Sequence, residues 1–201
     1  MRILDLLFPP RDDESALRAF SDDEFLAHIE PQLVTVTHPR ATALMSFQKP
    51  VVRSAIHEAK YHGSERAFDL LAQALGDYLR DGDDGLTRPI IIPVPLGPER
   101  RKERGFNQVE ALCERALIGT GFEIDRYLLI RTRETVSQVS LPRDKRQENM
   151  RGAFKATRQL DPSRTYIIID DVVTTGATLQ AAVDAVLEAG AIHIAPLALA
   201  H

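Results

Sequence analysis

The stretch from Tyr166 to Thr178, YIIIDDVVTTGAT, constrains the fold of this chain more than any other segment. Its first four residues are apolar or aromatic and have the composition of a buried β-strand. The acidic pair Asp170 and Asp171 follows, and then a small turn rich in hydroxyl groups. Beyond the turn, apolar side chains recur at helical spacing, at Leu179, Ala182, Val183, Val186 and Leu187. The stretch therefore predicts a strand, a tight turn and a helix, which Gly190 ends.

The predicted turn has the properties of a phosphate-binding loop. Backbone N–H groups at the start of a helix point outward, and the helix dipole adds partial positive charge there. Glycine permits backbone conformations that a side chain would forbid, and threonine hydroxyls donate further hydrogen bonds. We therefore expect a phosphate group to be bound by Thr174, Thr175, Gly176, Ala177 and Thr178.

The two carboxylates beside this turn cannot bind the same anion, because like charges repel. They suit the vicinal hydroxyl groups of a sugar, or a Mg²⁺ ion held together with the ligand. Acidic pairs also occur at strand ends without any function, so the pair is informative only together with the loop. Asp170 and Asp171 are thus the candidate catalytic and Mg²⁺-binding residues of a ribose 5-phosphate site.

Composition limits the class of protein. The chain has 201 residues, of which 44% are hydrophobic, which fits one domain of ordinary size with a small appendage. Its net charge of −4 means that any contact with nucleic acid would have to be local. The single cysteine, Cys113, excludes an internal disulfide and is expected in the core. Neither a signal peptide nor an apolar run of about 18 residues is found, so we expect a cytoplasmic protein without a membrane span.

Hydrophobic patterns divide the chain into two parts. Residues 1–31 are expected to form an N-terminal helical appendage, with a capping box that begins at Ser21. Residues 32–201 are expected to form the main domain. Its predicted elements are a hairpin over residues 33–38 and 43–47, helices over 50–59, 67–79 and 106–117, and strands at 90–92, 128–130 and 192–200. Strands that alternate with helices predict an α/β fold with a parallel sheet.

The complete motif at residues 166–178 resembles the signature of the type I phosphoribosyltransferases. That signature is a hydrophobic strand, two acids and a Thr-Thr-Gly-x-Thr loop, and the chain matches it in every part. The resemblance implies a central, mostly parallel sheet flanked by helices. It also implies that the ligand is 5-phosphoribosyl 1-pyrophosphate (PRPP), or a related nucleotide, with Mg²⁺ as cofactor. The pyrophosphate group of such a donor needs a second binding site.

The loop after the strand at residues 90–92 is the expected place for the pyrophosphate, because ligands of open α/β sheets lie beyond the carboxyl ends of strands. The loop resembles the pyrophosphate loop of the same fold at Pro95, Leu96 and Gly97. Basic segments at residues 99–104 and 143–151 each carry a net charge of +2. We expect both to be loops near this sheet edge, with pyrophosphate candidates at Arg101, Arg104, Arg143 and Arg146. Solvated loops, or loops that serve a protein partner, are the alternative.

Several other segments resemble the competence-associated ComF family. They are the Pro-Val-Pro loop with Arg-Gly-Phe-Asn-Gln at residues 104–108, Lys-Tyr-His-Gly at 60–63 and Gly-Ala-Phe at 152–154. The first nine residues also resemble the start of ComF proteins, which normally leads into a zinc ribbon with paired cysteines. This chain departs there, because an acidic segment without cysteine replaces the ribbon.

The resemblance implies that a nitrogen nucleophile displaces pyrophosphate at the anomeric carbon of PRPP, with an acceptor that the sequence does not identify. Tyr61, His62 and Phe106 could stack on a nucleobase, although single aromatic residues more often belong to the core. Two alternatives stay open. One is a ComF-like nucleotide-binding accessory of DNA uptake, which works with a DNA-uptake protein partner and without turnover. The other is a regulatory sensor of PRPP. A homodimer is possible in each case.

Overall fold

The computed structural model describes residues 11–82, 89–133 and 148–201. The helices are α2 (Asp12–Ala19), α3 (Asp22–Leu26), α4 (Pro50–His57), the π-helix η1 (Glu58–His62), α5 (Glu65–Asp81), α6 (Pro98–Arg104), α7 (Gln108–Ala116) and α9 (Ala177–Glu188). The strands are β1 (Gln32–Val34), β2 (Ala41–Met45), β3 (Ile90–Pro93), β4 (Glu123–Ile124), β5 (Leu129–Arg131), β6 (Phe154–Ala156), β7 (Thr165–Val172) and β8 (His193–Ala200). None of the described helices is long and apolar enough to cross a membrane.

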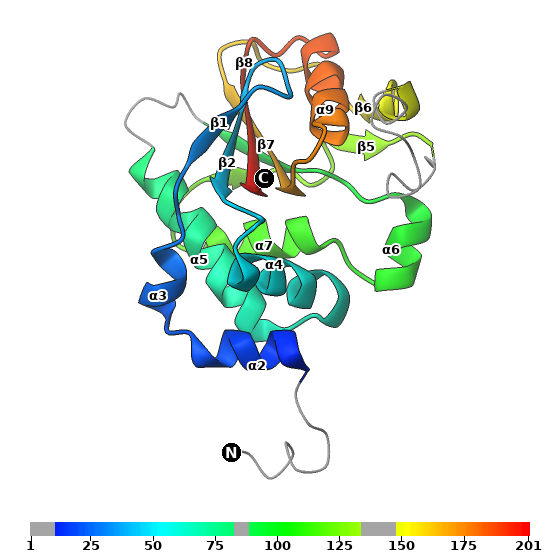
Figure 1. Cartoon of the computed structure of the whole chain (residues 1–201). Coiled ribbons are helices and arrows are strands. Elements are labelled where there is room, and N and C mark those ends of the chain that lie inside the picture. Colours follow the sequence, from blue (N-terminus) through cyan, green and yellow to red (C-terminus); the bar gives the residue numbers. More distant parts are fainter. Residues whose placement is uncertain (1–10, 83–88, 134–147) are drawn as a thin grey trace.

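A six-stranded sheet forms the centre of the molecule, with strand order β1-β2-β8-β7-β3-β4 (Figure 1). The strands from β2 to β4 in this order are parallel, and β1 joins the edge as the antiparallel arm of a hairpin. In the middle of the sheet, β7 pairs with β3 through Ile91 and Ile167 and with β8 through Ile168 and Pro196. The predicted α/β fold with a mostly parallel sheet is confirmed.

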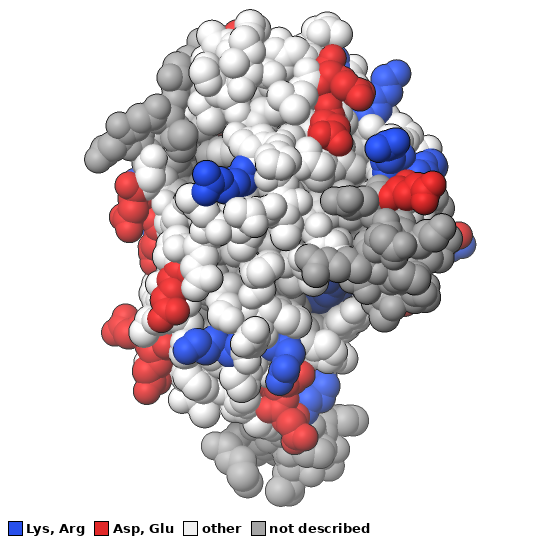
Figure 2. Space-filling view, turned by 45° about the horizontal axis from the view of Figure 1, so that its top comes forward, with Lys and Arg blue, Asp and Glu red and all other residues white. Residues whose placement is uncertain are grey.

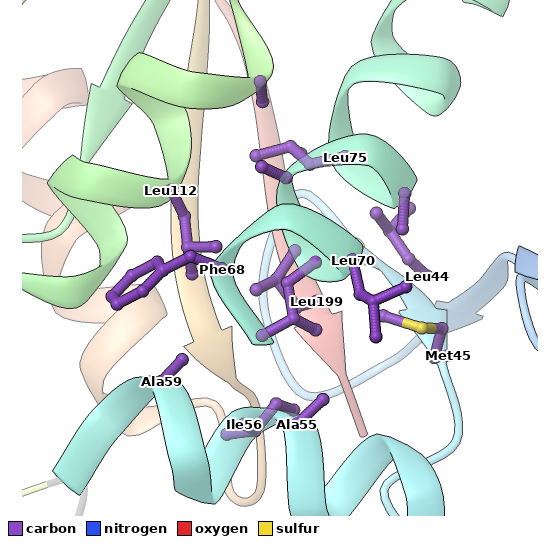
Figure 3. Packing of buried hydrophobic residues seen from close by; sticks show 14 of the residues in the cluster. Leu44, Met45, Ala55, Ile56, Ala59, Phe68, Leu70, Leu75, Leu112 and Leu199 are labelled. Carbon is purple, nitrogen blue, oxygen red and sulfur yellow. The ribbon is translucent and has the colours of Figure 1, made fainter. Parts of the chain in front are cut away.

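Helices cover both faces of this sheet, which explains why its central strands are apolar without interruption. Alternate residues of β7 belong to different core clusters: Ile167 and Ile169 pack with α4, α5 and α7, whereas Tyr166 and Ile168 pack with α9. In Figure 3, Leu199 of β8 lies among Leu70, Ile56 and other apolar side chains of the first cluster. Cys113 is fully buried in that cluster, as predicted, and burial raises the pKa of its thiol.

The N-terminal helices belong to the same core. Leu17 of α2 and Phe25 of α3 are fully buried against the helices on one face of the sheet. The predicted capping box is confirmed, because the Glu24 N–H donates to Ser21 Oγ at 3.3 Å and the Ser21 N–H donates to Glu24 Oε2 at 2.8 Å. Residues 1–10 of the predicted appendage lie outside the described residues.

Local structure departs from the sequence-based expectation in three places. The basic segment 99–104 is helix α6 and not a loop, because Pro98 occupies a first-turn position where its missing N–H has no cost. Strand β7 continues through Asp170 and Asp171 to Val172, so the acids lie within the strand and not after it. The strand expected at residues 128–130 forms β5, which pairs with β6 in a separate two-stranded sheet.

Candidate functional site

The loop between β7 and α9 contains the five predicted phosphate-binding residues, Thr174 to Thr178. Gly176 is the N-cap of α9 with φ +76°, and its carbonyl accepts a hydrogen bond from the Gln180 N–H at 2.7 Å. The loop and Asp170 surround a small depression of about 20 Å³. The N-terminus of α9 therefore borders a polar hollow, as phosphate binding would require.

Contact with a distant hairpin restricts the backbone at Gly176. A Cβ atom at this position would lie 2.4 Å from the carbonyl oxygen of Val36, in the connection between β1 and β2. The same connection is tied to α9, because the His38 N–H donates to Gln180 Oε1 at 2.6 Å and Gln180 Nε2 donates to the His38 carbonyl at 3.2 Å. The sequence-based reason for this glycine, a backbone conformation that a side chain would forbid, is confirmed by its φ of +76°, and the close approach of the Val36 backbone is a second reason that the sequence does not show.

The two acids have different surroundings, because successive side chains of a strand point to opposite sides. Asp170 lines the hollow beside the loop, and its Oδ1 accepts the Asp171 N–H at 2.9 Å. Asp171 is only 7% exposed, and its Oδ2 accepts Gln108 Nε2 at 2.7 Å and lies 2.8 Å from Lys60 Nζ. Protein groups thus already pair with Asp171, whereas Asp170 also borders the hollow beside the loop.

The pKa values of the pair are driven apart. Burial, and then the charge of Asp171, raise the pKa of Asp170 from its ordinary value of 3.8 to about 7. Burial also acts to raise the pKa of Asp171, but the Lys60 ammonium and the hydrogen bond from Gln108 outweigh it and lower that pKa. Sites where the pKa values of two neighbouring carboxyl groups differ in this way are often functional.

The raised pKa of Asp170 predicts a pH-dependent stability. Because the folded protein binds the Asp170 proton more tightly than the unfolded chain, the stability that this proton contributes is complete below pH 3.8 and is lost as the pH rises through about 7. Asp170→Asn should therefore stabilise the ligand-free protein by about 1 kcal/mol or more at pH 8, since one pKa unit corresponds to about 1.4 kcal/mol. Urea denaturation of both proteins at pH 5 and pH 8 measures this. An equal difference at the two pH values would contradict it.

A larger cavity of about 720 Å³ opens beside Asp170 and Asp171. This volume is within the range of small-molecule sites. Cationic side chains from four segments line it, namely Arg53, Lys60, Arg100, Arg104 and Arg131. Besides Asp170 and Asp171, the only acidic side chain among the described residues of this lining is Glu103. On the face shown in Figure 2, charged side chains of both signs are interspersed. An anionic ligand would therefore be attracted by this cavity and not by the surface as a whole.

The predicted pyrophosphate residues separate into three groups. Leu96 and Arg104 line the cavity, with Thr174 and Thr178 of the phosphate loop. Pro95 and Gly97 lie in the same loop as Leu96 but do not line the cavity, and Gly97 is the N-cap of α6. Arg101 is 3.8 Å from Glu110 and also lies outside the cavity lining. Arg143 and Arg146 are in the segment 134–147, outside the described residues.

The helical structure of α6 explains which of its cations line the cavity. Residues three and four positions apart share a face of a helix. Arg100, Glu103 and Arg104 have this spacing and line the cavity, while Arg101 lies on another face. Arg100 was missed because the segment was expected to be a loop; helical spacing would have grouped it with Arg104.

Lys60 and Gln108 were also missed, although both belong to segments that resemble the ComF family. Asn107 positions Gln108: its Oδ1 accepts the Val109 N–H at 3.1 Å, and its Nδ2 donates to the Val94 carbonyl at 3.1 Å. This cap starts α7 directly beside Asp171. The family motif was the available signal, but which residues these side chains contact depends on the tertiary fold.

Comparisons with known proteins identify relatives over part of the chain. No family model matches the chain. DNA utilization protein YhgH of Escherichia coli O157:H7 is 37% identical over 101 residues, which cover 50% of this chain and 44% of that protein. Competence protein F of Haemophilus influenzae is 33% identical over 92 residues, or 45% of this chain and 40% of that protein. The chain thus spans about half the length of the curated relatives it matches.

Among solved structures, the glutamine PRPP amidotransferase of Bacillus subtilis in complex with ADP and GMP aligns with a TM-score of 0.46 and 16% identity, covering 72% of this chain and 30% of that one. The relatives named for competence and DNA utilization agree with the resemblance to the ComF family that the sequence motifs indicate. The mostly parallel sheet and the loop after its central strand agree with the signature at residues 166–178. The chain is therefore a ComF-like protein with the type I phosphoribosyltransferase fold.

Proposed function

We propose that this chain binds PRPP together with Mg²⁺ and transfers the phosphoribosyl group to a nitrogen acceptor. The observation that carries the proposal is the set of residues that line the 720 Å³ cavity. It brings Thr174 and Thr178 of the phosphate loop, the carboxylate of Asp170, and the cations Arg100 and Arg104 to one space. A ligand with an anionic group at each end and a sugar between them matches this distribution of charge.

Each part of the donor has a proposed partner. The loop Thr174–Thr178 binds the 5-phosphate through its amide and hydroxyl groups. Asp170 accepts hydrogen bonds from the ribose hydroxyls, while Asp171 holds Lys60 and Gln108 in position. The Leu96 loop and α6 bind the pyrophosphate. The role predicted for Arg143 and Arg146, closure over the pyrophosphate, remains part of the proposal.

Mg²⁺ fits this set of residues as a part of the ligand. Mg²⁺ is commonly bound through one or two carboxylates and the phosphates of a substrate. Asp170 lines the cavity, and burial, followed by the charge of Asp171, raises the pKa of its carboxyl group to about 7, so a cation bound beside it would stabilise the carboxylate form. Bound there with pyrophosphate, the ion would supply charge neutralisation for the leaving group.

The proposed reaction is a substitution at the anomeric carbon. The nitrogen lone pair forms a bond to C1 of the ribose while the bond from C1 to the pyrophosphate oxygen breaks, and the electron pair leaves with pyrophosphate. The proton of the nitrogen passes to the pyrophosphate or to water. Positioning of the two reactants and electrostatic stabilisation of the separating charges would supply the rate enhancement, with the Asp170 carboxylate next to the positive ribose and the α6 cations next to pyrophosphate.

Calorimetric titration of PRPP, with and without Mg²⁺, is the direct test. We expect Mg²⁺-dependent binding that the double change Asp170→Asn with Asp171→Asn weakens at least about 100-fold, a loss of roughly 3 kcal/mol. The matched control is Asp81→Asn, an exposed acid at the end of α5, which should bind as the unchanged protein does. Donor binding that survives the double change would show that the ribose assignment is wrong.

A second function is favoured by the relatives that are named for competence and DNA utilization. In that case the chain binds its nucleotide ligand, contacts a DNA-uptake protein and catalyses no transfer. Pyrophosphate release from PRPP, measured with a panel of nucleobases and amines, separates the two. Release with any acceptor supports the transferase. Donor binding without release, combined with reduced DNA uptake in a deletion strain, supports the accessory role; unchanged uptake would count against it.

A further inference from the structure

A π-helix lies at the edge of the cavity and brings two histidines together. Helix α4 continues into η1, whose residues Glu58–His62 have π-helical hydrogen bonding. Residues five apart, such as His57 and His62, would be separated by about 140° around an α-helix. The i→i+5 bonding of a π-helix instead places them on one face. Their ring centroids are 5.5 Å apart with an interplanar angle of 68°.

A carboxylate completes this group. His57, Glu58 and His62 can each place one ligand atom within 4.8 Å of those of the other two. The side chain of Glu58 is fully buried, whereas those of His57 and His62 are 47% and 32% exposed, so an ion can reach the group from solvent. Two imidazoles and one carboxylate form a ligand set that zinc uses in proteins. We propose that His57, Glu58 and His62 bind a divalent transition metal of the zinc type, separate from any Mg²⁺ bound with PRPP.

The surroundings of His57 support this assignment. Its Nδ1 is 3.1 Å from Asp13 Oδ2, and Asp13 Oδ1 in turn accepts the hydroxyl of Ser54 at 2.6 Å. Histidines that ligate a metal commonly donate their other ring N–H to a carboxylate, which fixes the tautomer and the ring orientation. With the proton on Nδ1, the lone pair of His57 Nε2 is available to a metal.

Arg11 places a positive charge beside the proposed metal site, which opposes the binding of a cation. Its guanidinium donates to both oxygens of Glu58, at 2.9 Å and 2.5 Å, and lies 3.4 Å from Glu14. Each carboxylate oxygen keeps a second lone pair, so this pairing does not exhaust Glu58. The positive charge of Arg11 nevertheless repels a cation. Its replacement by glutamine should therefore tighten metal binding, a response that two unrelated surface histidines would not show.

Metal binding at this group has a structural consequence. Lys60 lies between Glu58 and His62 in η1, and its ammonium group is 2.8 Å from Asp171. An ion held by residues on both sides of Lys60 would fix the π-helical turn and thereby the position of this ammonium group. The ion would also join α2, which carries Asp13, to the wall of the cavity.

The test uses the full chain without an added histidine tag, freed of metal with EDTA. We expect one Zn²⁺ per chain in competition with a chromophoric chelator, and visible absorption bands on addition of Co²⁺. His57→Ala and His62→Ala should each weaken Zn²⁺ binding by at least about 100-fold, and Asp13→Asn by roughly 10- to 100-fold. Arg11→Gln should strengthen it. The control His193→Ala, an exposed histidine at the start of β8, should have no effect.

Three results would overturn the proposal. The first is the absence of stoichiometric Zn²⁺ binding, and the second is its persistence in the variant that lacks both His57 and His62. The third is its loss in Asp170→Asn, which would locate the ion at the acidic pair. Because both histidines are exposed, the variants should fold, and thermal denaturation checks this. In the unchanged protein Zn²⁺ should raise Tm, and in the double variant it should not.

Discussion

Replacing Gly176 with alanine is expected to destabilise the protein by about 3 kcal/mol and to abolish PRPP binding. A positive φ costs a residue with a side chain about 1–2 kcal/mol, and the value at Gly176 is +76°. The new Cβ would also lie 2.4 Å from the Val36 carbonyl oxygen, so the loop or the hairpin must move. Forced overpacking adds about 1–3 kcal/mol. Urea denaturation and calorimetric titration with PRPP measure the two effects.

Gly119→Ala is the matched control for this prediction. Its φ of +75° is almost the same as that of Gly176, but apart from Gly119 itself and its two chain neighbours no described atom lies within 4 Å of the position of its Cβ. It should therefore cost only the conformational term, about 1–2 kcal/mol. Equal losses in the two variants would show that the contact with Val36 contributes nothing to stability.

The second large effect is expected at the pair formed by Asp171 and Lys60. Asp171→Asn leaves the ammonium group of Lys60 without its carboxylate in a mostly buried position. Breaking a fully buried pair in this way costs about 3–5 kcal/mol. The side chain of Lys60 keeps 23% exposure, so we expect a loss of about 2–3 kcal/mol. Urea denaturation at pH 7 measures the loss.

A double-mutant cycle with Lys60→Met tests whether the pair itself is responsible. The coupling energy between the two positions should be about 1 kcal/mol or more, within the range found for contacting residues. The comparison is the exposed pair of Arg115 with Glu65, for which Glu65→Gln should cost less than about 1 kcal/mol. A coupling energy near zero at Asp171 and Lys60 would mean that this contact does not hold the carboxylate in place.

Local patterns were sufficient to predict most of the fold. The apolar run at residues 166–169, the helical spacing after Thr178 and the capping box at Ser21 each depend on neighbouring residues, and the structure confirms them as β7, α9 and α3. The hairpin was also recognised, although β1 ends at Val34 because residues 35–39 turn toward α9. The bounds of short strands therefore depend on what the flanking loop contacts.

Contacts between distant segments could not be predicted. Asp170 and Asp171 differ in their surroundings because Lys60 pairs with Asp171 alone. Lys60 is 111 positions from Asp171, and no sequence pattern predicts this pairing. Helix α6 has a charged sequence without apolar periodicity, so the rule that identified the other helices does not apply to it. The π-helical hydrogen bonding of η1 was likewise not predicted, because the resemblance at residues 60–63 does not indicate a type of helix.

The strand order has a consequence for how this chain is made. Strand β2, at residues 41–45, has no place in the parallel sheet until residues 193–200 insert between it and β7. The hairpin that packs against Gly176 is therefore synthesised early but can dock only after the whole intervening chain has left the ribosome. Contacts of such long sequence separation form slowly. Assembly of the ligand site should thus be a late, post-translational event, and a ribosome-bound chain that stops short of residue 193 should lack it.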